Sequence, residues 1–230
     1  MPEEKKSDDY LEIQTTSDGS HTIFVPGLNE HYHSVFGAIS ESRHIFIGAG
    51  LNFISQKNKK IHILEIGFGT GLNALLTYIE SEKNKLSINY SSLELYPLKE
   101  ELFSKLNYSE QIQFQDVTEI FLKLHNGEWD QEVIISEFFS LKKMNISLLN
   151  YIPENQNFDL IYFDAFGPEV QPEMWTLEVF TKMASCLKSG GVMVTYSTKG
   201  TVKRNLKEAG FIIEKLPGPL GKREILRGII

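Results

Sequence analysis

The sequence predicts an α/β protein in which a mostly parallel sheet carries helices on both faces. Short apolar stretches, of which Phe158–Phe163 is the clearest, alternate with helical stretches of about ten residues. The last two expected strands, 211–215 and 224–230, are joined only by the Gly/Pro-rich segment 217–221. This pair without a helix predicts one antiparallel hairpin at the edge of the sheet.

Length and composition agree with a globular protein. The 230 residues are 41% apolar and 23% charged, which is typical of globular domains. No apolar run approaches the roughly 20 residues of a membrane-spanning helix, and the charged segment 1–9 lacks the apolar core of a signal peptide. The single cysteine, Cys186, excludes an internal disulfide and a multi-cysteine zinc site. We expect a cytoplasmic protein without membrane contact.

The formal net charge of −7 hides an uneven distribution. The segment 182–230 contains ten Lys/Arg and three Glu, a net charge of +7, so that residues 1–181 carry −14. The average argues against a nucleic-acid partner, whereas the basic segment would suit one. An anionic partner is therefore expected at the C-terminal part, unless these charges form only a solvated helix face.

The first 55 residues predict a small extension. Residues 10–25 form two expected strands around the turn-forming cluster Ser17–Ser20, and Ser34 is a candidate N-cap for a helix that ends near Phe46. We divide the chain into this hairpin-and-helix extension, 1–55, and a main α/β unit, 56–230.

The main unit alternates strands and helices. Each expected strand is a short apolar run, and glycine or proline marks several of the helix ends. The expected strands before the terminal hairpin are 61–66, 88–94, 132–135, 139–143, 158–163 and 192–196. The expected helices are 72–81, one beginning near Pro97, 175–187 and 199–208.

A glycine-rich loop follows the strand 61–66 and opens the helix 72–81. Its glycines let the backbone approach a ligand, and the helix N-terminus offers free N–H groups. Glu65 precedes this loop, and Glu94 ends the next strand, where an acid can hold two ribose hydroxyls. The expected cofactor contacts here are Glu65, Gly67, Phe68, Gly69, Thr70, Gly71, Asn73 and Glu94.

Glu65 narrows the choice of cofactor. A carboxylate beside the loop would oppose the pyrophosphate of a dinucleotide, but it suits a ligand with a cationic amino-acid portion and no phosphates, such as S-adenosylmethionine. Leu72 also departs from the G-x-G-x-x-G/A pattern of NAD(P)-binding loops. The adenine is expected near 144–147, where Asn145 can accept its amino group through the side-chain oxygen; Ser147 is the other candidate.

Asp164 follows the strand 158–163 and is the expected catalytic residue. Ligands of open α/β sheets bind beyond the carboxyl ends of the strands, so Asp164 should face both cofactor and acceptor. A carboxylate there can accept the N–H of an attacking amine, orient it and take its proton. Apolar walls that exclude water are expected from Phe166, Pro168 and Trp175.

A metal is not expected. Methyl transfer to an amine needs neither a metal nor a covalent nucleophile. Glu30–His33 contains two histidines at i and i+2, but no third ligand stands at a recognisable spacing. We expect this segment to be packed or to line the substrate site.

The residues assembled so far resemble the methyltransferase half of the MnmC family, which also occurs as the stand-alone MnmD type. The resemblance covers nearly the whole chain and implies the Rossmann-like class I methyltransferase sheet. Its segments are 32–34, 64–73, 164–168, 171–176, 202–206, 209–211 and 221–226. The D-x-F-x-P, P-x-M-W and K-R-E elements are the specific ones.

The resemblance implies methylation of the 5-aminomethyl group of tRNA wobble (2-thio)uridine, giving the 5-methylaminomethyl form. In larger relatives an FAD-dependent oxidoreductase half prepares this amine, so we expect methylation alone, with a separate oxidoreductase acting upstream. The implied partner is the tRNA anticodon loop, read by basic and aromatic side chains. The expected RNA-facing residues are Tyr196, Lys199, Lys203, Arg204, Lys222 and Arg223.

Two positions depart from the family pattern, and other functions stay open. Relatives often carry Lys or Arg where this chain has Val170 and its neighbours, and Asn145 replaces the usual acid. The alternatives are another small-amine or aminopropyl transferase on the same fold, an NAD(P)-dependent oxidoreductase, and a non-catalytic binding domain. The basic C-terminal segment counts against a polyamine substrate, and Glu65 counts against NAD(P).

Overall fold

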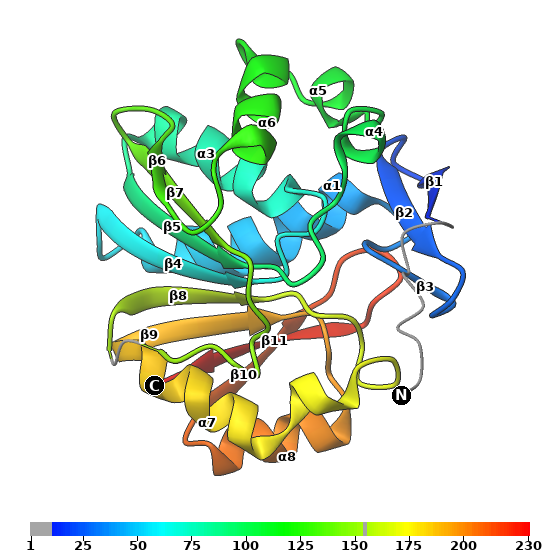
Figure 1. Ribbon diagram of the computed structural model, residues 1–230. Coiled ribbons are helices and arrows are strands. Elements are labelled where there is room, and N and C mark those ends of the chain that lie inside the picture. The colour runs from blue at the N-terminus through cyan, green and yellow to red at the C-terminus, as the bar shows by residue number, and fades with distance from the viewer. Residues whose placement is uncertain (1–10, 154–155) are drawn as a thin grey trace.

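The computed structural model describes residues 11–153 and 156–230, so the N-terminal segment 1–9 lies outside the described residues. An eight-stranded sheet forms the centre, in the order β10-β11-β9-β8-β4-β5-β7-β6 (Figure 1). Its five central strands are parallel: β4 (Lys60–Ile66), β5 (Ser87–Leu93), β7 (Phe139–Met144), β8 (Phe158–Phe163) and β9 (Leu187–Thr195).

Antiparallel strands stand at both edges of this sheet. The predicted terminal hairpin is confirmed as β10 (Ile212–Pro217) and β11 (Glu224–Ile229), which joins β9. At the other edge β6 (Glu132–Ile134) pairs antiparallel with β7. The direction of strand order reverses at β4, between β5 and β8, which is where an open α/β sheet leaves room for a ligand.

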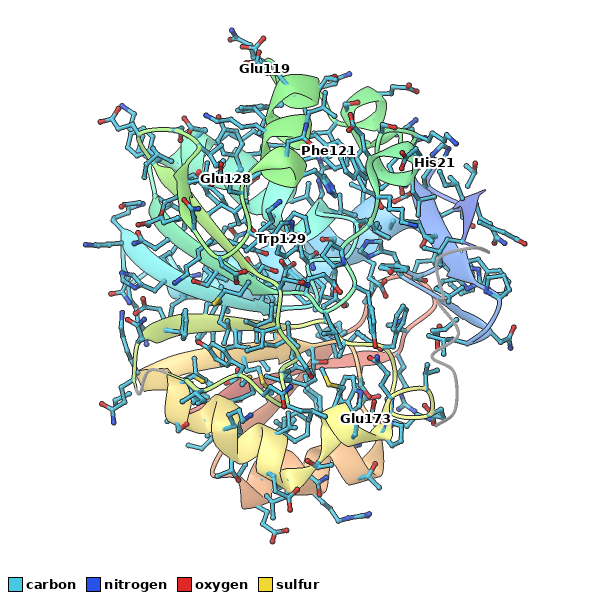
Figure 2. All side chains as sticks on the ribbon, viewed as in Figure 1. His21, Glu119, Phe121, Glu128, Trp129 and Glu173 are labelled. Atoms are coloured by element: carbon cyan, nitrogen blue, oxygen red, sulfur yellow. The ribbon has the colours of Figure 1, made fainter. Side chains whose placement is uncertain are left out.

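Helices cover both faces of the sheet (Figure 1). One face carries α3 (Leu72–Asn84), α4 (Glu100–Phe103), α5 (Tyr108–Gln111) and α6 (Val117–Asn126); the other carries α7 (Leu177–Cys186) and α8 (Gly200–Glu208). Side chains fill the space between the layers, among them the buried Phe121 of α6 (Figure 2). Within the described residues, no helix combines the length and apolar character needed to cross a membrane.

The N-terminal hairpin is confirmed as β1 (Glu12–Thr15) and β2 (His21–Val25), extended by β3 (Glu30–His31). The helix expected from Ser34 begins instead at Ala38 and continues to residue 54 as α1 (Ala38–Ser42), the π-helical η2 (Arg43–Leu51) and α2 (Asn52–Ile54). Residues 34–37 form a turn, closed by Gly37 N–H donating to Ser34 O. Asp18 takes the capping role, since its carboxylate accepts from Ser40 N at 2.9 Å.

Two other helix predictions need correction. The helix expected at 175–187 begins at Leu177, because Thr176 caps it by accepting from Val179 N, and Pro172–Trp175 forms a separate 3-10 turn (η3). Of the region after Pro97, only the presence of a helix was predicted. The short α4 is followed by α5 and α6; α4 and α5 have only four residues each, too few to show a helical period in the sequence.

The helical part of the extension is packed against the sheet. Gly50 lies so close to it that an added Cβ would be 3.1 Å from Val194, 3.2 Å from Tyr162 and 3.3 Å from Leu160. Ile45, Phe46 and Leu51 belong to the same apolar cluster as residues of β4, β8 and β9. Of the described residues, those of the extension from 11 to 55 therefore share one apolar core with the main α/β unit.

This contact gives a stability prediction. Gly50→Val should lower the free energy of unfolding in urea by about 1–3 kcal/mol, because its branched side chain has no room against three packed side chains. Gly48→Val is the control, since Gly48 is exposed on the same helical turn and an added Cβ there would meet a single atom, the backbone oxygen of Arg43 at 3.3 Å, instead of three packed side chains. Equal stability of the two variants would contradict the close packing of Gly50.

Candidate functional site

The glycine loop lies between β4 and α3, as predicted. Gly67, Gly69 and Gly71 have φ angles of 91°, 48° and 72°, which L side chains rarely adopt. A Cβ at position 67 would lie 3.1 Å from the backbone oxygen of Asp164, and one at position 71 would lie 2.7 Å from Nε2 of His125. The loop therefore needs glycine both for its backbone angles and for its close neighbours.

A cavity of about 810 Å³ opens beyond the carboxyl ends of β4, β5 and β8. The loops after these strands form its walls together with residues 30–35, the segment after β9 and the β10–β11 loop. The predicted site residues on its wall are Gly67, Phe68, Gly69, Thr70, Asn73, Glu94, Asp164, Phe166, Pro168, Tyr196, Lys199, Lys222 and Arg223.

Glu94 stands at the predicted place, directly after β5. Its Oε2 accepts from Gly69 N at 2.9 Å and its Oε1 from Tyr96 N at 2.8 Å. Burial raises the pKa of Glu94, and these backbone N–H groups act against the rise. The carboxylate thus joins the glycine loop to the end of β5 on the cavity wall.

Glu65 lies beneath the cavity and is absent from its wall, in contrast to our expectation of a direct contact. It is fully buried, with Oε2 accepting from Ser92 Oγ at 2.6 Å. Its Oε1 is buried without a hydrogen-bond partner. Burial raises its pKa to about 8, against the lowering effect of Ser92, Tyr90 and Asn73. Because side chains alternate between the two faces along β4, Glu65 projects from the same face of the sheet as Ile61 and Ile63, whose apolar cluster includes residues of α3.

Asn145, which we expected beside the adenine, does not line the cavity. Its side chain is exposed, and Nδ2 donates to the backbone oxygens of Glu94 at 2.9 Å and Leu95 at 3.2 Å. It therefore ties the loop after β7 to the loop after β5. Its neighbours Ile146–Leu149, including Ser147, reach the cavity instead.

Asp164 follows β8 and faces the cavity, as predicted. Its Oδ2 accepts from Asn73 Nδ2 at 2.8 Å, and Oδ1 of Asn73 in turn accepts from Ser42 Oγ. Burial raises the pKa of Asp164 well above the usual aspartate value; Asn73 opposes this rise, Glu41 and Glu65 add to it, and Lys222 opposes it. Such a carboxylate can hold a proton more readily than a solvated one.

Aromatic side chains border the acceptor end of the cavity. Tyr32 and Phe166 meet edge to face, with ring centroids 5.1 Å apart. Tyr196 donates from its hydroxyl to the backbone oxygen of Ala165 at 2.9 Å. Trp175, expected on the wall, is buried behind it and donates from Nε1 to Phe166 O at 2.7 Å, so it supports the loop after β8.

The predicted basic residues separate into three groups. Lys199, which pairs with Glu169, and Arg223 are exposed residues of the cavity wall. Lys222 is turned inward, with Nζ 2.9 Å from Oε1 of Glu41. The remaining two, Lys203 and Arg204, do not reach this cavity; with Lys207 and Lys215 they line a separate hollow between α8 and β10.

Two polar residues of the N-terminal part, Glu41 and His33, also line the cavity. The sequence analysis did not predict Glu41 and predicted only the segment that contains His33. Glu41 is buried on α1, and sequence offered no signal for it because it stands in an otherwise ordinary helix. His33 lines the cavity, as expected of its segment, and its Nε2 lies 2.7 Å from Thr70 Oγ1. Burial lowers its pKa to about 4, with Glu41 and Asp18 opposing the shift. A neutral His33 thus supports the glycine loop.

The described part of the chain contains no group of three His, Cys, Asp or Glu side chains arranged to hold a metal ion. His31 contacts Gln14 through Nε2 at 3.1 Å, and His33 contacts Thr70. The two histidines therefore have different partners and do not form a ligand pair.

Comparison with known proteins identifies relatives that match most of the chain. The bifunctional protein MnmC of tRNA 5-methylaminomethyl-2-thiouridine biosynthesis from Leptospira borgpetersenii serovar Hardjo-bovis (strain JB197) is 31% identical over 216 residues, 87% of this chain and 32% of that protein. The MnmC of Pseudoalteromonas atlantica is 30% identical, over 95% of this chain and 33% of its own length. This chain thus spans about a third of the length of these relatives.

Among solved structures, MNMC2 from Aquifex aeolicus superposes with a TM-score of 0.77 and 25% identity, covering 98% of this chain and 71% of that one. Residues 97–230 match the family Methyltransf_30, S-adenosyl-L-methionine-dependent methyltransferase. Because this match includes more than half of the chain, and with it β8 and Asp164, the chain belongs to this family of S-adenosyl-L-methionine-dependent methyltransferases.

Proposed function

We propose that this chain methylates the 5-aminomethyl group of tRNA wobble (2-thio)uridine to the 5-methylaminomethyl form. The observation that carries the proposal is Asp164, a carboxylate of raised pKa that faces the cavity beside the glycine loop. The names of the MnmC relatives support the tRNA substrate. A tRNA substrate also agrees with the cytoplasmic location expected from the sequence.

The residues around the glycine loop fit S-adenosylmethionine. When bound, this cofactor supplies an electrophilic methyl group on a cationic sulfur. Glu94 is hydrogen-bonded to the loop, and Asp164 is hydrogen-bonded to Asn73 of α3, so two carboxylates adjoin the loop. They would repel a pyrophosphate and attract a cation. Glu65, beneath the loop, has a buried Oε1 without a hydrogen-bond partner.

We assign the cofactor contacts within this set. Glu94 would hold the ribose hydroxyls, and the loop Gly67–Asn73 would surround the amino-acid portion. Glu65 lies beneath this loop and would affect the cofactor through the loop, without contacting it directly. Ile146–Leu149 would lie against the adenine, while Asn145 holds their loop in place through Glu94 and Leu95.

Asp164 would act on the acceptor amine. The amine attacks only as a neutral group, so one N–H proton must be accepted as the new bond forms. Asn73 fixes one oxygen of Asp164 at 2.8 Å, which orients the carboxylate toward the cavity. Its raised pKa makes it a stronger proton acceptor than a solvated aspartate. Phe166, Pro168 and Tyr196 would exclude water from this end.

The basic C-terminal residues would bind the RNA backbone. Lys199 and Arg223 stand on the cavity wall, and Lys203 and Arg204 continue this charge along α8. Phosphates of the anticodon loop would lie along these basic residues, from the cavity wall to α8, while the wobble base enters the cavity. We infer that Lys222, paired with Glu41, contributes within the site and not on this surface. The aminomethyl substrate would come from a separate FAD-dependent oxidoreductase.

The alternatives are less well supported. The carboxylates around the loop oppose NAD(P). A spermidine synthase from Thermotoga maritima superposes with a TM-score of 0.56 over 96% of this chain, but at 12% identity this is a likeness of fold alone. The basic segment 182–230 would also repel a polycationic substrate.

Nucleoside mass spectrometry of tRNA tests the proposal. A strain deleted for this chain should accumulate 5-aminomethyl-uridines, and the purified protein with S-adenosylmethionine should convert them to the 5-methylaminomethyl form. Unchanged wobble uridines in the deletion strain, together with no conversion in vitro, would refute the substrate assignment.

Glu94→Gln tests the cofactor site. Loss of the charge that would hold the ribose hydroxyls should weaken S-adenosylmethionine binding by about 10- to 100-fold, since hydrogen bonds to charged groups contribute about 1.5–3 kcal/mol. Isothermal titration measures the dissociation constant. Glu100→Gln, an exposed acid on α4, is the control and should bind like the wild type.

Asp164→Asn tests the catalytic role. The amide keeps the size of the side chain but cannot take the proton, so the rate should fall by about 10²–10⁴-fold. Cofactor binding should persist in isothermal titration. Asp159→Asn is the matched control, because Asp159 stands at the opposite end of β8, where it accepts from His62 N and Lys188. Turnover near the wild-type level in Asp164→Asn would remove Asp164 from the reaction.

A further inference from the structure

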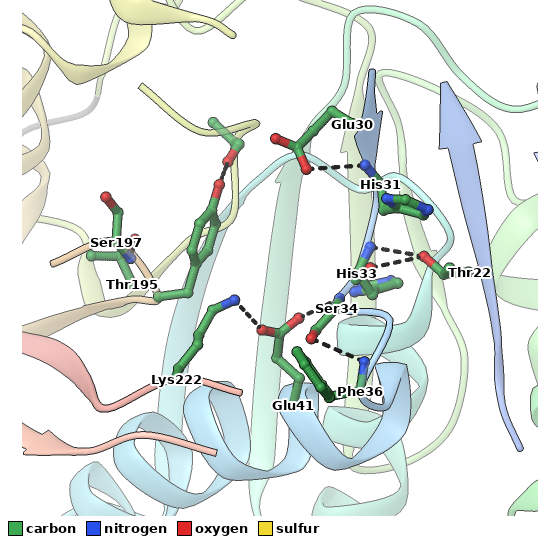
Figure 3. A network of polar contacts seen from close by, with 12 residues as sticks. Thr22, Glu30, His31, His33, Ser34, Phe36, Glu41, Thr195, Ser197 and Lys222 are labelled. Atoms are coloured by element: carbon green, nitrogen blue, oxygen red, sulfur yellow. Dashed lines mark hydrogen bonds and ion pairs between the residues drawn. The ribbon is translucent and has the colours of Figure 1, made fainter. Parts of the chain in front are cut away.

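An inward-facing ion pair borders the acceptor end of the cavity. Lys222, in the β10–β11 loop, and Glu41, on α1, approach to 2.9 Å with side-chain exposures of 28% and 11% (Figure 3). The other oxygen of Glu41 accepts from Ser34 N at 2.8 Å. The pair thus connects the C-terminal hairpin to the N-terminal helix across the cavity.

Lys222 also contacts Tyr196, which is hydrogen-bonded to the loop after β8. Its Nζ lies 5.1 Å from the ring centroid of Tyr196, within the range of a cation–π interaction. Tyr196 in turn donates from its hydroxyl to Ala165 O at 2.9 Å. Ala165 is the residue next to Asp164, so the cation holds the backbone beside the catalytic carboxylate through one aromatic ring.

A second path returns from Asp164 to the same helix. Asp164 accepts from Asn73, and Asn73 accepts from Ser42 Oγ. Ser42 is the neighbour of Glu41 on the chain. The contacts therefore form a closed ring that starts and ends on α1 and passes through the β10–β11 loop, the ends of β9 and β8, and α3.

Charged groups around Asp164 shift its pKa. Glu41 of α1 and Glu65 of β4 raise this pKa, and Lys222 lowers it. The phenols of Tyr90 on β5 and Tyr196 after β9 also interact with Asp164. The other ionisable groups of the cavity wall are Glu30, His31, Tyr32, His33, Glu94, Tyr96, Glu169, Glu173, Lys199, Arg223 and Glu224. Lys222 is thus the cation that opposes Glu41 and Glu65 at Asp164.

We propose that Glu41 and Lys222 are positioning residues that orient Tyr196 and Asp164 and balance the charge around Asp164 for proton acceptance. The choice of an amine acceptor rests on the function proposed above; the effect on Asp164 does not. Lys222 stabilises the carboxylate form of Asp164 and Glu41 destabilises it. Loss of Lys222 should therefore raise the pKa of Asp164, and loss of Glu41 should lower it.

The direct test is a ¹³C NMR titration of the Asp164 carboxyl carbon in the full chain, assigned by its absence in Asp164→Asn. Lys222→Met should raise its pKa by about one unit and Glu41→Gln should lower it by about one unit, the low end of the effect of a nearby charge. The double variant should return close to the wild-type value. Lys222→Arg, which keeps the cation, should remain near it as well.

The pH dependence of activity should shift in the same directions as the pKa of Asp164. If Asp164 accepts the proton, the rate rises with pH as Asp164 ionises. The acid limb of the kcat profile should therefore move to higher pH in Lys222→Met and to lower pH in Glu41→Gln. Displacement of Tyr196 should lower kcat further, by up to about 10²-fold, with unchanged affinity for S-adenosylmethionine. Lys83→Met, which removes a cation remote from the cavity on α3, is the control.

The outcomes separate the two proposals. A titration of Asp164 that does not move, or moves in the same direction in both single variants, overturns the role of the ion pair whatever the substrate. A wild-type chain that cannot methylate tRNA refutes the proposed function, and the NMR titration still decides on Glu41 and Lys222. If Lys222→Met fails to fold, Glu41→Gln and the double variant give the same decision.

Discussion

The close passage of two loops at the centre of the sheet determines the rest of the site. β4 and β8 are parallel neighbours, and the loops that follow them meet at Gly67 and Asp164, where an added Cβ would lie 3.1 Å from a backbone oxygen. Glycine, at a φ of 91°, accommodates this approach without strain. It brings the loop that would hold the cofactor against the carboxylate that would serve the acceptor, so both halves of a methyl transfer share one cavity.

Burial of carboxylates is the electrostatic consequence of this arrangement. Glu65, Glu94 and Asp164 all have raised pKa values, in each case chiefly because of burial. Each carboxylate also accepts hydrogen bonds, from Ser92, from backbone N–H groups and from Asn73, which stabilise the charged form. A site of this kind favours a cationic ligand and offers a place for a proton, two properties that methylation of an amine requires.

Sequence patterns predicted what depends on local order along the chain. Strands 61–66 and 158–163, the glycine loop and Asp164 were predicted because apolar runs and glycines determine them locally. Glu65, Asn145 and Trp175 lie off the cavity wall, because the direction of a side chain depends on residue alternation and on contacts with distant segments. Glu41 and the inward position of Lys222 could not be predicted, since their contact joins residues 181 positions apart in the chain. From its charge, we had expected Lys222 on the RNA-facing surface.

The N-terminal helical segment supports the loops at the catalytic end of the cavity, which the parallel sheet alone does not hold. The loops after β8 and β9 end on the open side of the sheet, where no strand continues to hold them. Ser42 and Glu41 reach these loops through Asn73 and Lys222, and Gly50 fastens the same helix to β8 and β9. The helix is thus fixed to the sheet at one end and to the site at the other. Weakening of its packing should therefore disturb Asp164 without any change in the strands that carry it.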